Sequence, residues 1–550
     1  MTGTDVIAKR DALRKWRSHH EQLWDEVAEL SMPRKITGAE LGNLPPMINS
    51  AELHDSTLRT ACLQLANGFC SLVTPREEVW HGLNPPKGLE DNDAVVKFYS
   101  ECSEELTHQL EQSNFYTSIQ ETYLDRAAMG TGADYSEWDD ENGMLNFRHL
   151  PIGTYFIGQD HRQRANCVIQ EIGYTADQAA QEFGIEKLPP KLQKEARDPK
   201  KNDIHVFLVL IEKVTEWSGG DKDMPYYMCC VHEESQTVVH TDGFFELPIH
   251  VTRYLQWGAS PYGFAPTWIA LPEAHKLSFL QKQMDVLAEK AANPPILAPA
   301  SLEGEIGVGA LDITYVNDLD PNRSPREWAT AGRYDIGQDR IMEKKKAIQE
   351  IMHGDLFRLF AQIERQMTAT EATLRQAEKV MQFSPTFSRL TSEYLDPKIR
   401  RIFGILWRQG LMPDPPEEIA QVNKDRSVMV PVPNVSYNNR IALAIKASQN
   451  TNYAEFISMN ESLVEMRPDI LDNIDMDHQF RDNWRNAGLP EKSLMDEDER
   501  DEKRAVRAEQ QAQAAQMEAA AQMASVAKDA SAANGGQLPE AMLEAQDQAL

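Results

Sequence analysis

Two helix-forming runs flank a proline-bounded insert between Ser260 and Gly410, and this order restricts the fold more than any other feature of the chain. Apolar residues of the first run recur at Leu277, Leu280, Met284, Leu287 and Ala291. Alternating three- and four-residue spacing predicts a narrow apolar seam that packs one long helix beside another. We expect this helix to begin near Pro272, because proline is tolerated in a first turn, and to end at Asn293-Pro294-Pro295.

The second run predicts a helix over about residues 336–353. Its apolar residues Ile341, Ile348 and Met352 fall on one side, which matches the seam of the first helix. The neighbouring lysines are expected to be exposed: Lys344, Lys345 and Lys346. The two runs therefore predict a helical pair whose far end carries the insert.

The chain beyond this pair is predicted to form a polar loop and then a long, broken helix. Thr368-Ala369-Thr370-Glu371 is a capping box, which opens a helix by pairing side chains with the first backbone N–H groups. Pro385 and Pro397 are expected to break the helix, since proline cannot donate a backbone hydrogen bond. Gly410 is expected to end it.

The N-terminal part predicts four helices, followed by a region of short strands. The expected helices are Thr4–Leu30, a helix opening at the capping box Asn49-Ser50-Ala51-Glu52 and ending near Leu72, Asn92–Gln112, and Phe115–Met129. The expected strands are Tyr135–Trp138, Met144–His149, Tyr155–Ile157, Cys167–Tyr174, His205–Val214, Tyr226–Val231, Thr237–His240 and Ile249–Leu255, with one helix at Ala176–Phe183. These patterns indicate a β-rich lobe attached to a helical body.

The C-terminal part combines proline-rich and alanine-rich segments. A short strand at Val428–Val432 precedes helices expected over about residues 440–447, 453–464 and 470–487. Residues 505–528 consist almost wholly of Ala, Gln, Glu, Met, Lys and Arg, which favour helix but offer little apolar area. In a single copy this segment is expected to be a marginal helix or disordered, whereas copies held side by side could form a tube.

Composition excludes several classes of protein. The formal net charge of −29 argues against a conventional duplex-DNA binder, which needs a basic surface, and a like-charged polyanion would be repelled. None of the six cysteines forms a C-x-x-C pair, which indicates reduced, buried thiols. The longest apolar run, Val206–Ile211, is too short to span a bilayer, and the polar N-terminus does not resemble a signal peptide.

No convincing catalytic, metal or cofactor site is recognisable. The chain has no P-loop, and the glycines of residues 304–309 stand in the wrong order for one. Ser260 only loosely resembles a nucleophile elbow. His20-Glu21 and His232-Glu233 lack the second histidine of a zincin, and His20 lies on an apolar seam, as a packed histidine would. The sequence predicts that the protein is not an enzyme.

A local basic excess in the acidic chain is a candidate interaction surface. It comprises Arg323, Arg326, Arg333, Arg340, Lys344, Lys345 and Lys346. A solvated helix face is one interpretation, and contact with acidic partners or DNA is the other.

Several motifs carry a resemblance to a known family. They are Leu65-Ala66-Asn67-Gly68-Phe69 with Thr74-Pro75 and Trp80, Ser260-Pro261-Tyr262-Gly263, Arg365-Gln366-Met367-Thr368-Ala369-Thr370-Glu371, and the Ala-, Gln- and Met-rich C-terminus. In order and spacing the chain resembles the head-to-tail connector, or portal, proteins of short-tailed podoviruses, over almost its whole length.

The resemblance implies an α+β, mainly α, elongated subunit with long stem helices, a β-rich wing lobe and a helical crown, assembling into a ring. The implied parts are 1–130, the N-terminal helical part of the wing or body; 131–259, the wing lobe; 260–293, the first stem helix; 294–335, the clip; 336–353, the second stem helix; 354–367, the tunnel loop; 368–412, the long broken helix; 413–490, the crown; and 491–550, a tail that is a barrel helix or disordered.

The resemblance also implies a function without catalysis or cofactor. Such a ring, a dodecamer in the family, sits at one capsid vertex of the virion and passes double-stranded DNA during packaging and ejection. Its partners are the terminase ATPase, the tail adaptor, and capsid and scaffolding proteins, with no membrane, and it assembles in the host cytoplasm. Arg358, Glu364 and Arg365 of the tunnel loop are candidates to face DNA, and the basic residues above are candidates in the clip and stem.

Two alternatives stay open at this point. An acidic helical scaffold or adaptor would bind other proteins without a DNA channel, with the seam helices bundled inside one subunit. A virion maturation hydrolase would use Ser260 or a pair of carboxylates. Neither alternative explains why a proline-bounded insert separates two seam helices.

Overall fold

The computed structural model describes most of the chain. The described residues are 1–32, 53–89, 92–198, 200–216, 224–292, 296–297, 326–327, 334–354, 383–422, 428–439, 441–442, 459, 475–486, 493–495 and 497–533. They form a mainly helical body with several small antiparallel sheets, which confirms the expected α+β class.

Four helices form the N-terminal part: α1 (Gly3–Ser31), α2 (Thr57–Leu72), α3 (Asp93–Gln112) and α4 (Phe115–Met129). The predicted bounds of α1, α3 and α4 are confirmed within a residue. The predicted start of α2 is wrong, because residues 53–56 are not helical, and the Thr57 N–H donates to Asp55 Oδ1 at 2.7 Å. The capping box at 49–52 lies outside the described residues. Leu65 and Phe69 of α2 are buried in the main core.

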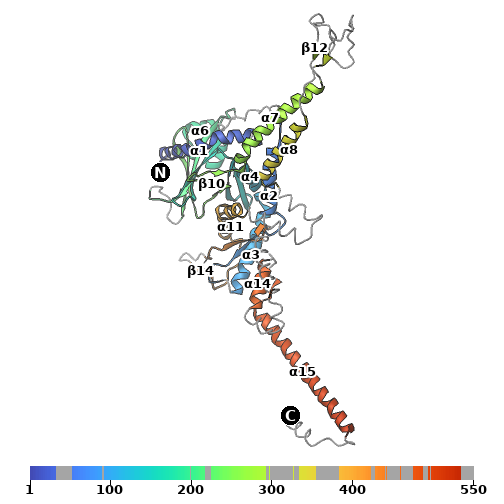
Figure 1. Ribbon diagram of the computed structural model, residues 1–550. Coiled ribbons are helices and arrows are strands. Elements are labelled where there is room, and N and C mark those ends of the chain that lie inside the picture. Colours follow the sequence, from blue (N-terminus) through green and yellow to red (C-terminus); the bar gives the residue numbers. More distant parts are fainter. Residues whose placement is uncertain are drawn as a thin grey trace.

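A five-stranded antiparallel sheet forms the larger part of the β-rich lobe. Its order is β4 (Tyr155–Gln159), β5 (Ala165–Thr175), β6 (Ile204–Lys213), β7 (Tyr226–His232) and β8 (Thr237–Phe244). One face packs on α1, where Val6 shares a buried cluster with Phe156 and Leu208. The other face packs on α5 (Ala176–Phe183), followed by α6 (Pro190–Glu195), and Phe183 contacts Phe207 there. The predicted strands and α5 are confirmed, and Figure 1 shows α1 and α6 beside this lobe.

A three-stranded sheet joins the lobe to the body. Its order is β3 (Met144–Leu150), β2 (Thr131–Asp139) and β9 (Ile249–Arg253). β2 directly follows α4 through Gly130, whose φ of +83° is a backbone conformation that glycine adopts without strain. A Cβ at Gly130 would also meet the backbone of Gly263. The chain can therefore leave α4 and enter the sheet within a single residue.

Two long helices project from the body, α7 (Pro266–Ala292) and α8 (Tyr334–Ile351). Figure 1 shows them side by side, with β12 (Ile296–Leu297) beyond their far end; β12 pairs with β13 (Arg326–Glu327). The predicted end of α7 is confirmed. Its predicted start is wrong: α7 begins at Pro266, where a missing N–H costs nothing, and Pro272 lies inside the helix. Buried residues before and after Pro272, such as Ala270 and Leu277, hold α7 together although one backbone hydrogen bond is missing.

The predicted break at Pro397 is also wrong. Residues 383–390 are helical, a π-helical turn follows at Thr391–Leu395, and α11 (Asp396–Arg408) continues without interruption. The N–H of Asp396 donates to Thr391, five residues back, and Pro397 then occupies the first turn of α11. Pro385 lies at the third residue of segment 383–390, whose N-terminal continuation is outside the described residues. Gly410, with φ of +69°, ends the helix as predicted.

Short strands bring distant parts of the sequence together. β1 (His81–Asn84) pairs with β16 (Asn434–Tyr437), and the other small pairs are β10 (Leu255–Gln256) with β11 (Gly263–Phe264) and β14 (Gln421–Val422) with β15 (Val428–Met429). The expected helices at 440–447 and 453–464 fall largely outside the described residues.

Two helices follow near the C-terminus, α14 (Met476–Asn486) and α15 (Glu497–Ala533). α14 confirms the expected helix of 470–487 over the residues that are described. The 37 residues of α15 are helical, and the described side chains between residues 501 and 522 are exposed. Figure 1 shows α15 leading away from the body on the side opposite to α7 and α8.

Candidate functional site

The seam between α7 and α8 is the feature around which the candidate site is built. Leu277 and Met284 of α7 are buried, as are Ile341 and Ile348 of α8, and Leu280 and Leu287 are partly buried. A Cβ at Gly337 would collide with the sulfur of Met284, so a larger residue there would require the Met284 side chain to move within the seam. The predicted seam is confirmed except at Ala291, which is exposed. The pair is therefore a packed rod and not two independent helices.

The outer surface of the same rod also carries large apolar side chains. On α7, Phe279 is 62% exposed, Ile269 52% and Val286 38%, and on α8 Met342 is 71% exposed. Phe279 and Val286 are seven residues apart, so they lie on one face of the helix. Apolar side chains grouped on a protruding element mark an interaction surface.

The basic residues of α8 divide into two kinds. Lys344 Nζ lies 3.0 Å from Glu273 Oε2, and Lys345 Nζ lies 3.2 Å from Asp55 Oδ2. The prediction that both are simply exposed is wrong, because acidic groups at the base of the rod hold them. The hydrogen bond that Lys344 donates to the Glu273 carboxylate raises the pKa of Lys344. Arg340 and Lys346 are exposed, as a solvated or partner-binding face requires.

The other candidates cannot be placed by their side chains. Arg326 belongs to β13, where only the backbone is described. The remaining candidates lie outside the described residues: Arg323, Arg333, Arg358, Glu364 and Arg365. Their roles stay predictions.

Polar contacts fix the rod to the body. His275 Nε2 of α7 lies 2.8 Å from Glu26 Oε1 of α1, and Lys345 reaches Asp55 at the entrance to α2. These pairs are partly exposed, so each contributes little stability, but together with the seam they fix the angle at which the rod leaves the body. The sequence could not indicate them, because the partners are far apart along the chain.

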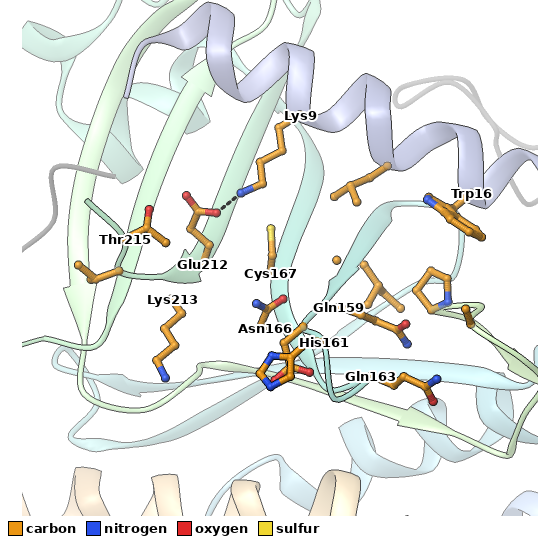
Figure 2. A pocket seen from close by; sticks show the side chains of 17 residues that line it. Lys9, Trp16, Gln159, His161, Gln163, Asn166, Cys167, Glu212, Lys213 and Thr215 are labelled. Atoms are coloured by element: carbon orange, nitrogen blue, oxygen red, sulfur yellow. Dashed lines mark hydrogen bonds and ion pairs between the residues drawn. The ribbon is translucent and has the colours of Figure 1, made fainter. Parts of the chain in front are cut away.

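A cavity of about 720 Å³ lies between α1 and the five-stranded sheet. Figure 2 shows Lys9 and Trp16 of α1 above it, with Cys167 and Glu212 on the strands and an ion pair joining Lys9 to Glu212. Burial raises the pKa of Cys167 to about 12, so the thiol stays protonated and is a poor nucleophile. The cavity thus contains no activated nucleophile among the residues that line it.

Ser260 lies between two residues that line this cavity, Ala259 and Pro261, and it contacts a histidine. His20 Nε2 lies 2.9 Å from Ser260 Oγ, a pairing that the sequence gave no reason to expect. The His20 ring stacks on Trp24 with centroids 5.7 Å apart, and burial lowers its pKa. Within the described part of the chain, no carboxylate hydrogen-bonds to the second ring nitrogen. The pair therefore lacks the third group that orients a catalytic histidine, and His20 is a packed side chain, as predicted.

The thiols agree with the expectation of buried, unpaired cysteines. All six cysteines are free, five of them buried and Cys70 partly so, and burial raises the pKa of Cys62 and Cys102 to about 12. None of the helices in the described ranges combines the length and hydropathy of a membrane span.

Comparison with known proteins gives a consistent result. The family model of the bacteriophage head to tail connecting protein matches residues 4–495. The portal protein of Salmonella phage epsilon15 is 25% identical over 477 residues, 84% of each chain. The probable portal protein of Bordetella phage BPP-1 is 23% identical over 482 residues, which cover 85% of this chain and 83% of that protein. The match includes the body, the lobe and both helices of the rod.

Proposed function

Since this chain belongs to the bacteriophage head to tail connecting proteins, we infer that it is a phage portal protein, which forms a ring channel at one capsid vertex. Double-stranded DNA enters the capsid through this channel during packaging and leaves through it at ejection. The observation that carries the proposal is the α7/α8 rod, which buries one apolar seam and exposes a second apolar face at Phe279 and Val286. A protruding rod with an uncovered apolar face is completed by a neighbouring subunit.

The proposed mechanism is mechanical and electrostatic, with no catalytic step. A channel that shares the sign of the −29 net charge repels phosphates, so DNA slides without sticking. Exposed cations such as Arg340 and Lys346 supply weak, salt-sensitive contacts that read no bases. The protein that hydrolyses ATP is a separate one.

The subunit is proposed to divide its contacts among several partners. Twelve copies form the ring, residues 131–259 form its outer wing, and residues 294–335 at the far end of the rod form a clip. The clip docks the packaging ATPase and later the tail adaptor, while the body contacts capsid and scaffolding proteins. The acidic helical adaptor remains the rival, in which the rod packs within one subunit only.

Residues 354–367 are proposed to project into the channel, where Arg358, Glu364 and Arg365 face DNA. The variants Arg358→Ala and Arg365→Ala should assemble normally but change the amount of DNA packaged or retained in filled heads. Glu417→Ala, an exposed substitution in the turn before β14, serves as the matched control. Normal packaging by both arginine variants would remove these side chains from the proposal.

The experiment that tests the portal function is imaging of the purified full-length chain by electron microscopy, together with native mass measurement. Closed rings with a central hole support the proposal, and their mass gives the subunit number. A strictly monomeric particle at micromolar concentration, or a compact assembly without a hole, would favour the adaptor instead.

A further inference from the structure

Two histidines that are 27 residues apart in the sequence meet on the five-stranded sheet. Phe207 of β6 pairs with His232 of β7, and the ladder continues where the Glu233 N–H donates to Val206 O at 3.0 Å. In this register His205 stands opposite Glu234, one step beyond the last pair. One ligand atom each from His205, His232 and Glu234 lies within 4.8 Å of the others.

We propose that His205, His232 and Glu234 bind a zinc ion at this edge of the lobe. Two imidazole nitrogens and one carboxylate oxygen are the donors that Zn²⁺ takes in three-residue sites, with water as the fourth ligand. Mg²⁺ and Ca²⁺ require more oxygen donors than this set provides. The site is independent of the DNA channel, since it lies on the lobe and not on the α7/α8 rod.

His205 has a partner that prepares it for this role. Its Nε2 lies 2.8 Å from Glu195 Oε2 of α6, and both side chains are largely buried. When Nε2–H donates to this carboxylate, Nδ1 keeps the lone pair that a metal needs. A carboxylate behind a histidine is the usual support of a metal ligand, because it fixes the tautomer and increases the basicity of the ring.

His232 provides the second, independent observation. The residue is 1% exposed, yet its Nε2 has no hydrogen-bond partner among the residues that the structure describes. Its Nδ1 lies 2.8 Å from Ser235 Oγ and accepts a hydrogen bond from the Ser235 backbone N–H at 3.3 Å. Metal binding at Nε2 would move the ring proton to Nδ1, where it would donate to Ser235 Oγ in place of the long bond from the Ser235 N–H. A buried nitrogen that is otherwise unsatisfied would then gain a partner.

Glu234 makes the site responsive to one neighbour. The carboxylate is exposed, and Lys191 Nζ lies 2.7 Å from its Oε1. The lysine cation competes with a metal for the same carboxylate, so removing Lys191 should strengthen binding. A gain in zinc affinity on removing Lys191 is what competition for the Glu234 carboxylate predicts.

The test is calorimetric titration of the full-length protein with Zn²⁺, repeated with Co²⁺ to record the absorption bands of a tetrahedral site. We expect one tight ion per chain. The affinity should fall at least about tenfold in His232→Ala and in the exposed variant Glu234→Gln, which leaves the core intact, and it should rise in Lys191→Ala. His108→Ala on α3, an exposed histidine away from the lobe, is the matched control and should bind as the unchanged protein does.

The contrary results are equally definite. The proposal is overturned if no stoichiometric ion binds, or if His108→Ala weakens binding as much as Glu234→Gln does. It is also overturned if Lys191→Ala weakens binding. Circular dichroism of His232→Ala shows whether that variant is folded. If it is not, the zinc affinity of Glu234→Gln alone tests the proposal.

Discussion

Lys398 of α11 forms an ion pair with Asp134 of β2 in the interior of the protein, and neither side chain is exposed. The Tyr394 hydroxyl donates to the same Asp134 oxygen at 2.7 Å, and Lys398 Nζ lies 4.8 Å from the ring centroids of Phe115 and Phe147. Burial lowers the pKa of Lys398, and the attraction of Asp134 partly restores it. The contact ties the long helix after residue 383 to the three-stranded sheet that joins the lobe to the body.

Replacing Lys398 by methionine should strongly destabilise the protein, because Asp134 would remain as a buried charge without its cation. Removing one member of a buried pair costs about 3–5 kcal/mol, whereas Lys398→Met with Asp134→Asn should recover much of that loss. Thermal unfolding of the single and double variants measures this. Lys346→Met, at an exposed position on α8, is the control, and an equal effect of both single variants would contradict the argument.

Charges on the outer face of α7 should prevent ring formation without unfolding the subunit. Phe279→Asp with Val286→Asp places two carboxylates on a surface that is exposed in one copy and that we propose is covered by the neighbouring subunit in the ring. Native mass measurement should show monomers whose circular dichroism is unchanged. Met144→Asp, another exposed apolar position, should still form rings, and rings formed by the α7 variant would show that this face is not an interface.

His81 should make the subunit sensitive to acid. The ring is fully buried, neither nitrogen has a hydrogen-bond partner within the described ranges, and burial lowers its pKa from 6.5 to about 4. Between pH 6.5 and about pH 4, His81 is protonated in the unfolded chain but stays neutral in the folded chain. The free energy of unfolding therefore falls as the pH drops below 6.5. Because of His81, the free energy of unfolding should be about 2 kcal/mol lower at pH 5 than at pH 7.5.

The comparison that isolates this group is His81→Phe, which preserves a ring next to Trp80. Melting temperatures of both proteins at pH 7.5 and pH 5 should show a smaller acid-induced decrease in the variant. Parallel decreases in the two proteins would assign the acid sensitivity to other groups.

Deleting residues 497–550 should leave the stability of the subunit unchanged. The described side chains of α15 from residue 501 to residue 522 are exposed, and its described contacts to the rest of the chain are made near its start, where Arg500 and Arg504 approach Asp477. Exposed ion pairs contribute little. Thermal unfolding and electron microscopy should show an unchanged melting temperature and intact rings. A large loss of stability would mean that copies of α15 pack on one another.

Ser260→Ala should not abolish function. Its hydroxyl makes one hydrogen bond to His20 and accepts another from the Tyr262 N–H at 3.2 Å, so the expected loss is about 1 kcal/mol of stability. Phage production complemented by the variant should be near normal, with His20→Gln as the companion variant. Complete loss of infectivity with rings still assembled would instead revive the hydrolase hypothesis.

The local sequence predicted most helices and strands because their signals are periodic and short-range. The bounds of α4 and α5 were predicted to the residue, since each is followed by a glycine at which the helix stops. The errors at Pro272 and Pro397 share one cause. Proline removes one hydrogen bond, and tertiary packing or a π-helical turn can hold the helix together across that loss.

The sequence by itself thus determined the class of fold, the two helices that flank an insert, the burial of the thiols and, through the order of its motifs, the family. Only the tertiary structure decided which distant side chains meet: Lys398 with Asp134, His205 with His232, Lys345 with Asp55, and β1 with β16. Periodicity states which side of an element is buried but not what covers it. That choice depends on the packing of the whole chain, where contacts between residues far apart in sequence are selected together.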